Sequence, residues 1–108
     1  MSAALDRKLA ALSDPQRRRA VDLLGAAPRR AGELAVELGL TAPAMSRHLR
    51  ALREAELVEE SHPPFDARVR IYRLRRGAMD ELKAWLEQTE RGWAEQLAAF
   101  KAHVEADG

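Results

Sequence analysis

The sequence predicts a mainly α-helical (α+β) domain of five helices, with a two-stranded β-hairpin between the fourth and fifth helices. Three observations lead to this prediction. Apolar residues recur at helical spacing through most of the first 55 positions, a period of two replaces that spacing over 57–74, and helical spacing returns from residue 77. Because the chain has 108 residues, we expect a single domain spanning 1–108 with one modest core.

The first two helices are expected over Leu5–Leu12 and 15–26. Ser13 or Asp14 is the predicted cap of the second helix, which has a proline in its first turn. An arginine cluster at 17–19 follows this cap. Its guanidinium groups either contact phosphates, stay solvated or pair with nearby aspartates, and the sequence does not distinguish these interpretations.

Residues 31–55 are typical of two short helices joined by a tight turn. Gly39 is the expected end of the first helix, and Thr41 is the expected N-cap of the second. The second helix has an apolar face made of Met45, Leu49 and Leu52. Its opposite face carries small, hydroxyl and guanidinium side chains, which suits insertion into the DNA major groove. An ordinary surface helix with a solvated basic face is the alternative.

Residues 57–74 predict the hairpin. The expected strands are Leu57–Ser61 and Arg68–Leu74, and the prolines between them cannot continue a regular ladder because they lack amide donors. Arg68 and Arg70 lie close to the expected tip. We therefore expect this hairpin to lie along DNA.

Residues 77–104 predict one long helix with more apolar surface than so small a domain needs for its own core. The surplus is most simply buried against a second copy, which predicts a homodimer. A helix folded back on its own domain is the alternative. The expected interface residues are Leu5, Leu9, Leu82, Trp85, Leu86, Trp93, Leu97 and Phe100.

Composition excludes several classes of protein. The chain has no cysteine, which excludes disulfides and thiolate metal sites, and it has no run apolar enough for a spanning helix. The N-terminus lacks the pattern of an export signal, so the cytoplasm is expected. No nucleophile, phosphate-binding loop or convergent histidine cluster indicates an enzyme.

Charge is unevenly distributed. Residues 1–76 hold 15 Lys and Arg against 10 Asp and Glu, whereas residues 77–108 hold 3 against 7. A basic body with an acidic tail suggests that the body meets a polyanion.

The order of the elements is that of a winged helix-turn-helix, and the sequence resembles the ArsR (ArsR/SmtB) family of transcriptional repressors. The resemblance rests on LAALSDPQRRRAVDLL at 9–24, GELAVELGLTAPAMSRHLRALREAELV at 32–58 and RVRIYRL at 68–74. It implies a homodimer that binds a palindromic operator in double-stranded DNA. The DNA-facing positions that it implies are Thr41, Ala42, Pro43, Ser46, Arg47, His48 and Arg50.

The chain departs from the family in two respects. Ala42 and Pro43 replace polar residues, which leaves more of the specificity to Ser46, Arg47, the hairpin and DNA shape. The family's metal-binding cysteines are missing, and His103 lacks the upstream ligands that a site in the last helix needs. We therefore expect no metal and no cofactor.

Two further functions stay open as alternatives. One is a winged-helix module for protein–protein contact, and the other is a metal-responsive repressor with a site on the last helix. A small-molecule effector, the operator and the regulated genes do not follow from the sequence.

Overall fold

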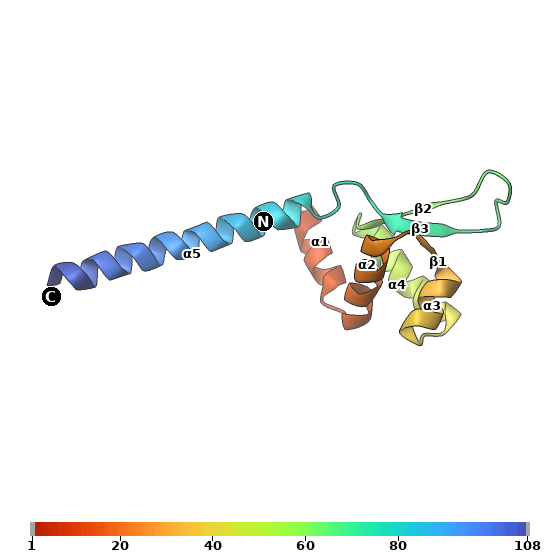
Figure 1. The fold of residues 1–108 in the computed structure, drawn as a ribbon, viewed down its shortest axis with the longest axis horizontal. Helices are drawn as coiled ribbons and strands as arrows, with labels where there is room; N and C mark the ends of the chain where they lie inside the picture. The colour runs from red at the N-terminus through yellow and green to blue at the C-terminus, as the bar shows by residue number, and fades with distance from the viewer. Residues whose placement is uncertain (1, 108) are drawn as a thin grey trace. The chain divides into compact units, whose positions relative to one another are not determined.

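A computed structural model of the protein describes residues 2–107, without the side chains of Trp93, Phe100 and Asp107. The chain divides into two compact units, residues 1–78 and 79–108. The first contains α1 (Ala3–Leu12), α2 (Pro15–Ala26), β1 (Arg29–Arg30), α3 (Ala31–Leu38), α4 (Ala42–Glu54), β2 (Val58–Ser61) and β3 (Ile71–Leu74), and the second is α5 (Asp80–Asp107) (Figure 1). A single domain over 1–108 stays a prediction.

Hydroxyl and carboxylate caps begin the first two helices. The Asp14 carboxylate accepts hydrogen bonds from the amides of Gln16 at 2.8 Å and Arg17 at 3.2 Å. Asp14 is therefore the cap of α2, one of the two residues predicted for this role. The Ser2 hydroxyl accepts a bond from the Leu5 amide at 3.0 Å, so α1 begins two residues earlier than the apolar spacing indicates.

The turn between α3 and α4 forms as predicted. Gly39 has a φ of +66°, in the left-handed region, and ends α3. The Leu40 amide then donates to the Ala35 carbonyl at 2.9 Å. The Thr41 hydroxyl accepts from the Ala44 amide at 3.2 Å, which caps α4. These local interactions place α3 and α4 at the two ends of one tight turn.

The core of the first unit lies beneath α4. The helices α1, α2 and α4 contact one another, and α3 packs on α2 and α4. The largest fully buried side chains are those of Leu34, Met45, Leu49, Leu52 and Leu57. Three of them are the predicted apolar face of α4, so the opposite face of this helix is directed toward solvent.

The hairpin belongs to a three-stranded antiparallel sheet with the order β1-β3-β2. Val58 pairs with Leu74 and Ser61 with Ile71, which confirms the hairpin. The third strand, β1, has only two residues, too few for a periodic pattern to reveal, and the sequence analysis missed it. Figure 1 shows a long loop that joins the far ends of β2 and β3.

The second strand of the hairpin is shorter than predicted. Residues 68–70 belong to the loop, because β3 begins at Ile71. The Asp66 carboxylate accepts the Arg68 amide at 3.0 Å, and the Asp66 carbonyl accepts the Val69 amide at 3.3 Å. Both amides are therefore used in turns instead of in the sheet.

The second unit is the helix α5, which has 28 residues. It begins at Asp80, later than the predicted residue 77, because Gly77 has a φ of +73° and the Ala78 amide closes a turn on the Arg75 carbonyl at 2.9 Å. The helix continues to Asp107. One continuous helix is therefore present, but over 80–107 instead of the predicted 77–104.

Candidate DNA-binding face

The outward face of α4 carries most of the predicted DNA-binding residues. Thr41, Ala42, Pro43, Ser46, Arg47 and Arg50 are all exposed. Within residues 2–107, the side chains of Ser46, Arg47 and Arg50 form no hydrogen bond or ion pair. Two guanidinium groups and a hydroxyl are thus free to bind a phosphate or a base edge.

His48 lies at the margin of this face. Its side chain is half-buried. Hydrogen bonds from the amide of Arg17 and, to a smaller extent, of Gln16 lower the pKa of Asp14, and the charge of His48 adds to this effect. His48 therefore lies near the cap of α2, at the edge of the exposed face of α4.

The arginine cluster at the start of α2 binds α1. Arg17 Nε donates to the carbonyl of Ala11 at 2.8 Å, and Arg18 Nη1 donates to that of Leu12 at 2.7 Å. Arg19 bonds to a neighbouring glutamine. Positive charge at a helix C-terminus is stabilising. The first two arginines cap α1, a role that the sequence analysis did not consider.

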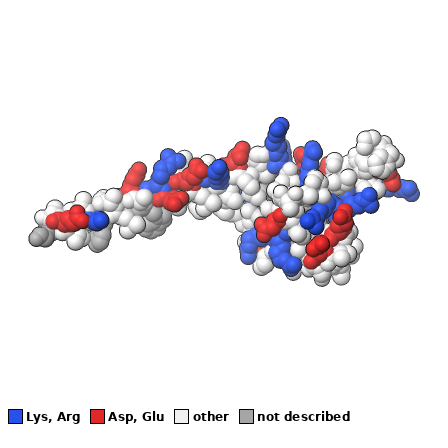
Figure 2. All heavy atoms as spheres, viewed as in Figure 1, with Lys and Arg blue, Asp and Glu red and all other residues white. Residues whose placement is uncertain are grey.

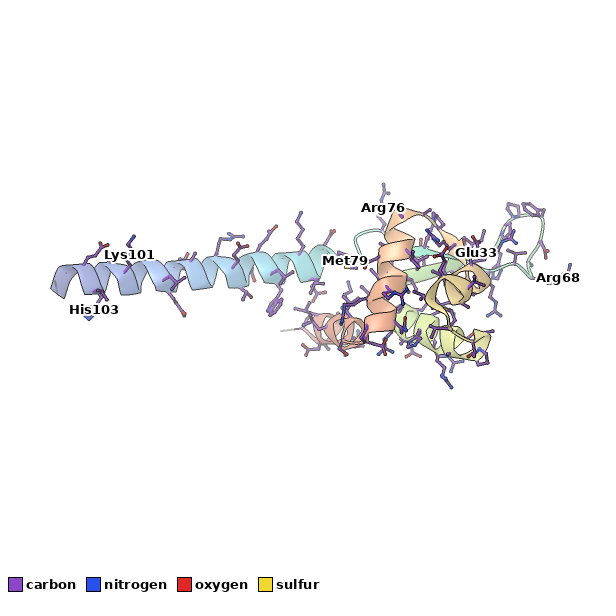
Figure 3. The ribbon with its side chains drawn as sticks, turned by 60° about the horizontal axis from the view of Figure 1, so that its bottom comes forward. Glu33, Arg68, Arg76, Met79, Lys101 and His103 are labelled. Atoms are coloured by element: carbon purple, nitrogen blue, oxygen red, sulfur yellow. The ribbon has the colours of Figure 1, made fainter. Side chains whose placement is uncertain are left out.

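The tip of the hairpin presents exposed side chains on a folded loop. The Asp66 amide donates to the Pro63 carbonyl at 3.2 Å, which closes a turn around Phe65. Phe65 is 86% exposed. The side chain of Arg68 is 92% exposed and pairs with Asp66, with 3.3 Å between Arg68 Nε and Asp66 Oδ1. Figure 3 shows Arg68 at the far end of this loop.

Carboxylates of β2 pair with the arginines around the hairpin. Arg73 Nε lies 2.6 Å from Glu59 Oε1, and Arg53 Nη1 lies 3.1 Å from Glu60 Oε2. Arg70 Nε lies 3.9 Å from Glu60 Oε1. Figure 2 shows acidic side chains between the basic ones on the first unit. Arg53 and Arg73 are therefore less available to DNA than Arg47.

Sequence reasoning did not identify Glu59 and Glu60 as the partners of arginines around the hairpin. The sequence shows the alternation of side chains along the strands, but it does not show the register in which β2 pairs with β3. In the structure Glu59 lies opposite Arg73 and Glu60 lies opposite Tyr72. The only signal in the sequence is the occurrence of two acidic residues in a hairpin rich in arginine.

The predicted dimer residues fall into three groups. Leu5 is 3% exposed and Leu9 is half-buried, so the first offers little surface to a partner in this conformation. Leu82 and Trp85 are half-buried, whereas Leu86 is 52% and Leu97 65% exposed. Val104, on the same helix, is 51% exposed. The predicted side chains of Trp93 and Phe100 lie outside the described ones.

The described side chains of residues 2–107 include no group of three or more His, Asp or Glu placed to hold a metal ion. No helix in this range is long and apolar enough to cross a membrane.

The buried and exposed faces of α4, the turn at Gly39 and the hairpin that follows define the class of this protein. It is a winged helix-turn-helix, in which α4 is the recognition helix and the hairpin of β2 and β3 is the wing.

Comparison with known proteins gives the family. The family described as "Bacterial regulatory protein, arsR family" matches residues 14–60. The HTH-type transcriptional regulator Rv2034 of Mycobacterium tuberculosis is 34% identical over 103 residues, covering 95% of this chain and 91% of that protein. The transcriptional repressor SdpR of Bacillus subtilis is 38% identical over 50 residues, covering 46% of this chain and 56% of that protein.

Among solved structures, an ArsR-like transcriptional regulator from Rhodococcus sp. RHA1 has a TM-score of 0.77 at 33% identity, over 92% of this chain and 91% of that one. The chain therefore belongs to the ArsR family of bacterial regulatory proteins and is a transcriptional regulator.

Proposed function

We propose that this chain acts as a homodimeric repressor that binds a palindromic operator through α4 and the wing. One observation carries the proposal. Ser46, Arg47 and Arg50 are exposed and free on one face of α4, while the other face of the same helix is fully buried in the core. A helix held this way inserts its polar face into the major groove without rearranging the domain.

The composition of the α4 face indicates how the readout is divided. Ala42 and Pro43 are exposed at the start of the helix but offer no polar side-chain atom to a base edge. Direct readout therefore depends on Ser46 and Arg47 in this proposal, and Arg50 binds the phosphate backbone. Arg68 and Arg70, on the wing, add phosphate or minor-groove contacts.

The homodimer rests on α5. Leu86, Leu97 and Val104 are each more than half exposed on one long helix, and burial of these side chains is favourable. A second copy offers the same apolar side chains, as an isologous interface requires. Dimerisation brings two recognition helices to successive major grooves, about one turn of DNA apart.

A regulator of this kind works by occupying DNA and needs no catalytic group or cofactor. The groove of about 250 Å³ beside α1, α2 and α4 carries Arg7, Arg17 and Glu54 on a floor of alanines, without a histidine or a nucleophile. We propose that the chain is not an enzyme, that it binds no metal and that it acts in the cytoplasm, as expected of a regulator of this family.

The test is selection of bound sequences from a random duplex pool by the purified protein. Selected sites are then measured at two salt concentrations, with and without zinc and nickel. We expect an enriched palindrome with half-sites one turn apart, and affinity that falls steeply with salt as phosphate counterions are released. A metal that changes the affinity would contradict the proposed absence of a metal site.

The opposite outcome is equally clear. If no sequence is enriched and binding is lost at moderate salt, operator recognition is wrong. The free guanidinium groups of α4 would then serve another acidic partner, as the protein–protein alternative predicts.

A further inference from the structure

The carboxylate of Glu60 lies where the recognition helix meets the wing. Its Oε2 atom lies 3.1 Å from Arg53 Nη1, at the end of α4, and 3.0 Å from the Tyr72 hydroxyl, on β3. Its Oε1 atom lies 3.5 Å from His62 Nε2 and 3.9 Å from Arg70 Nε, both in the wing loop. One oxygen thus faces the end of α4 and β3, and the other faces the wing loop.

The Glu60 carboxylate that makes these contacts is largely shielded from solvent. The Glu60 side chain is 16% exposed, compared with 50% for Arg53 and 63% for Arg70. A partly buried carboxylate with several donors is held more firmly than an exposed ion pair. Tyr72 is itself buried, and this burial, together with the neighbouring Glu60 carboxylate, raises the pKa of the Tyr72 hydroxyl, which therefore stays a donor.

The loop side of the contact is also fixed. His62 Nδ1 lies 2.9 Å from the Val69 carbonyl, across the base of the wing loop. This contact ties the two arms of the loop together and orients the ring so that Nε2 faces Glu60. The carboxylate, the imidazole and the Arg70 guanidinium therefore form one cluster beneath the wing.

We propose that Glu60 is a positioning residue for operator recognition: it sets the wing relative to α4, so that the arginines of both elements reach DNA in one register. This inference rests on the proposed function. The Glu60 carboxylate also has an unfavourable effect on DNA binding. It offsets the positive charge of Arg53 and Arg70 and so weakens the sequence-independent attraction of the protein to phosphates. Glu60 therefore lowers the affinity for random DNA and raises the ratio of operator to random affinity.

Glu59 offers a matched control. It precedes Glu60 on β2, carries the same charge and pairs with Arg73 at 2.6 Å, but its carboxylate forms no hydrogen bond or ion pair with α4 or the wing loop. Glu59→Gln and Glu60→Gln therefore remove the same charge from neighbouring positions, and only Glu60→Gln disturbs the contact between recognition helix and wing.

The experiment uses the full chain and the operator selected by the unsubstituted protein. Dissociation constants for operator and for random duplex are measured over a salt series, and each variant is checked by circular dichroism and thermal unfolding. We expect both variants to bind random duplex more tightly and with a steeper salt dependence. Only Glu60→Gln should reduce the ratio of operator to random affinity, by about tenfold, which corresponds to 1.4 kcal/mol.

A second variant keeps the inference testable if Glu60→Gln folds poorly. Tyr72→Phe removes one of the four contacts without changing charge, and the ring still fills its buried site. It should lower the discrimination ratio by a smaller factor and leave the salt dependence unchanged.

Equal discrimination ratios for Glu59→Gln, Glu60→Gln and the unsubstituted chain would overturn the inference, because Glu60 would then act only through its charge. An unchanged ratio for Tyr72→Phe would do the same where Glu60→Gln cannot be measured. If the unsubstituted chain selects no operator at all, it is the proposed function that fails, and the two failures are thereby distinguished.

Discussion

Arg47 and Arg53 lie on the same helix, but their charges are used differently. Arg53 pairs with Glu60 at 3.1 Å, whereas the Arg47 side chain has no partner within residues 2–107. The sequence places both on the polar side of α4 and does not distinguish them. At the scale of single residues, pairing decides which cations remain available to DNA.

Replacement of Arg47 by alanine is expected to weaken operator binding by about 1–3 kcal/mol and to relax the preference at one base position. The reason is that a guanidinium group reads a base edge with two parallel hydrogen bonds. Competition binding with operators substituted at single positions measures both effects. Arg50→Ala is the comparison, and it should weaken binding to operator and random duplex by the same factor. An equal loss on both duplexes for Arg47→Ala would show that Arg47 contacts only phosphate.

Asp14 is expected to make stability depend on pH in acid. Hydrogen bonds to the ionised carboxylate lower its pKa below the ordinary value of 3.8, so the cap contributes stability above that pH and loses it as pH falls through the lowered pKa. Asp14→Ala should therefore lower the Tm at pH 7. The difference in Tm between the variant and the unsubstituted chain should become smaller below pH 3.8. Thermal unfolding over pH 2–7, roughly the range in which carboxylates titrate, measures this. A Tm difference that stays constant over this pH range would show that the charge of Asp14 does not contribute to the stability that the cap provides.

The turn between α3 and α4 depends on one backbone conformation. Gly39→Ala is expected to cost about 1–2 kcal/mol, because an alanine is strained at a φ of +66° although space for its methyl group is open. Gly32 is the control, since it lies in α3 with open space around it and without a positive φ. Gly32→Ala should be neutral or stabilising by up to about 1 kcal/mol. Urea unfolding measures the free energy of unfolding of both variants. Equal changes for Gly39→Ala and Gly32→Ala would exclude strain at Gly39.

Among the elements, the helices were more predictable than the wing. Capping residues and apolar spacing mark α3 and α4, and both formed at the expected residues. The wing depends on Asp66, whose carboxylate and carbonyl bind the amides of Arg68 and Val69 and so delay the start of β3. A short-range competition of this kind for amide donors is not visible in strand periodicity.

At the scale of the whole molecule, the exposed leucines of α5 are expected to hold two copies together. The double variant Leu86→Glu and Leu97→Glu should be monomeric and should bind operator far more weakly, because each half-site would then be bound separately. Sedimentation equilibrium and operator binding measure the two effects. Gln88→Glu with Gln96→Glu adds the same charge at exposed polar positions of α5 and should stay dimeric. A dimeric leucine variant would contradict the proposed interface.

The sequence by itself determined the order of the helices and the hairpin, the turn at Gly39, the apolar face of α4 and the family, because caps, periodic spacing and motifs are local signals. Only the tertiary structure decided which charges are paired. Arg17 binds the end of α1, and Glu60 joins Arg53 to the wing, through contacts that depend on how α1 packs on α2 and on the register of β2 with β3. How neighbouring helices pack and in which register strands pair are tertiary properties even where the contacting residues are close in the chain, and no spacing along the chain records them.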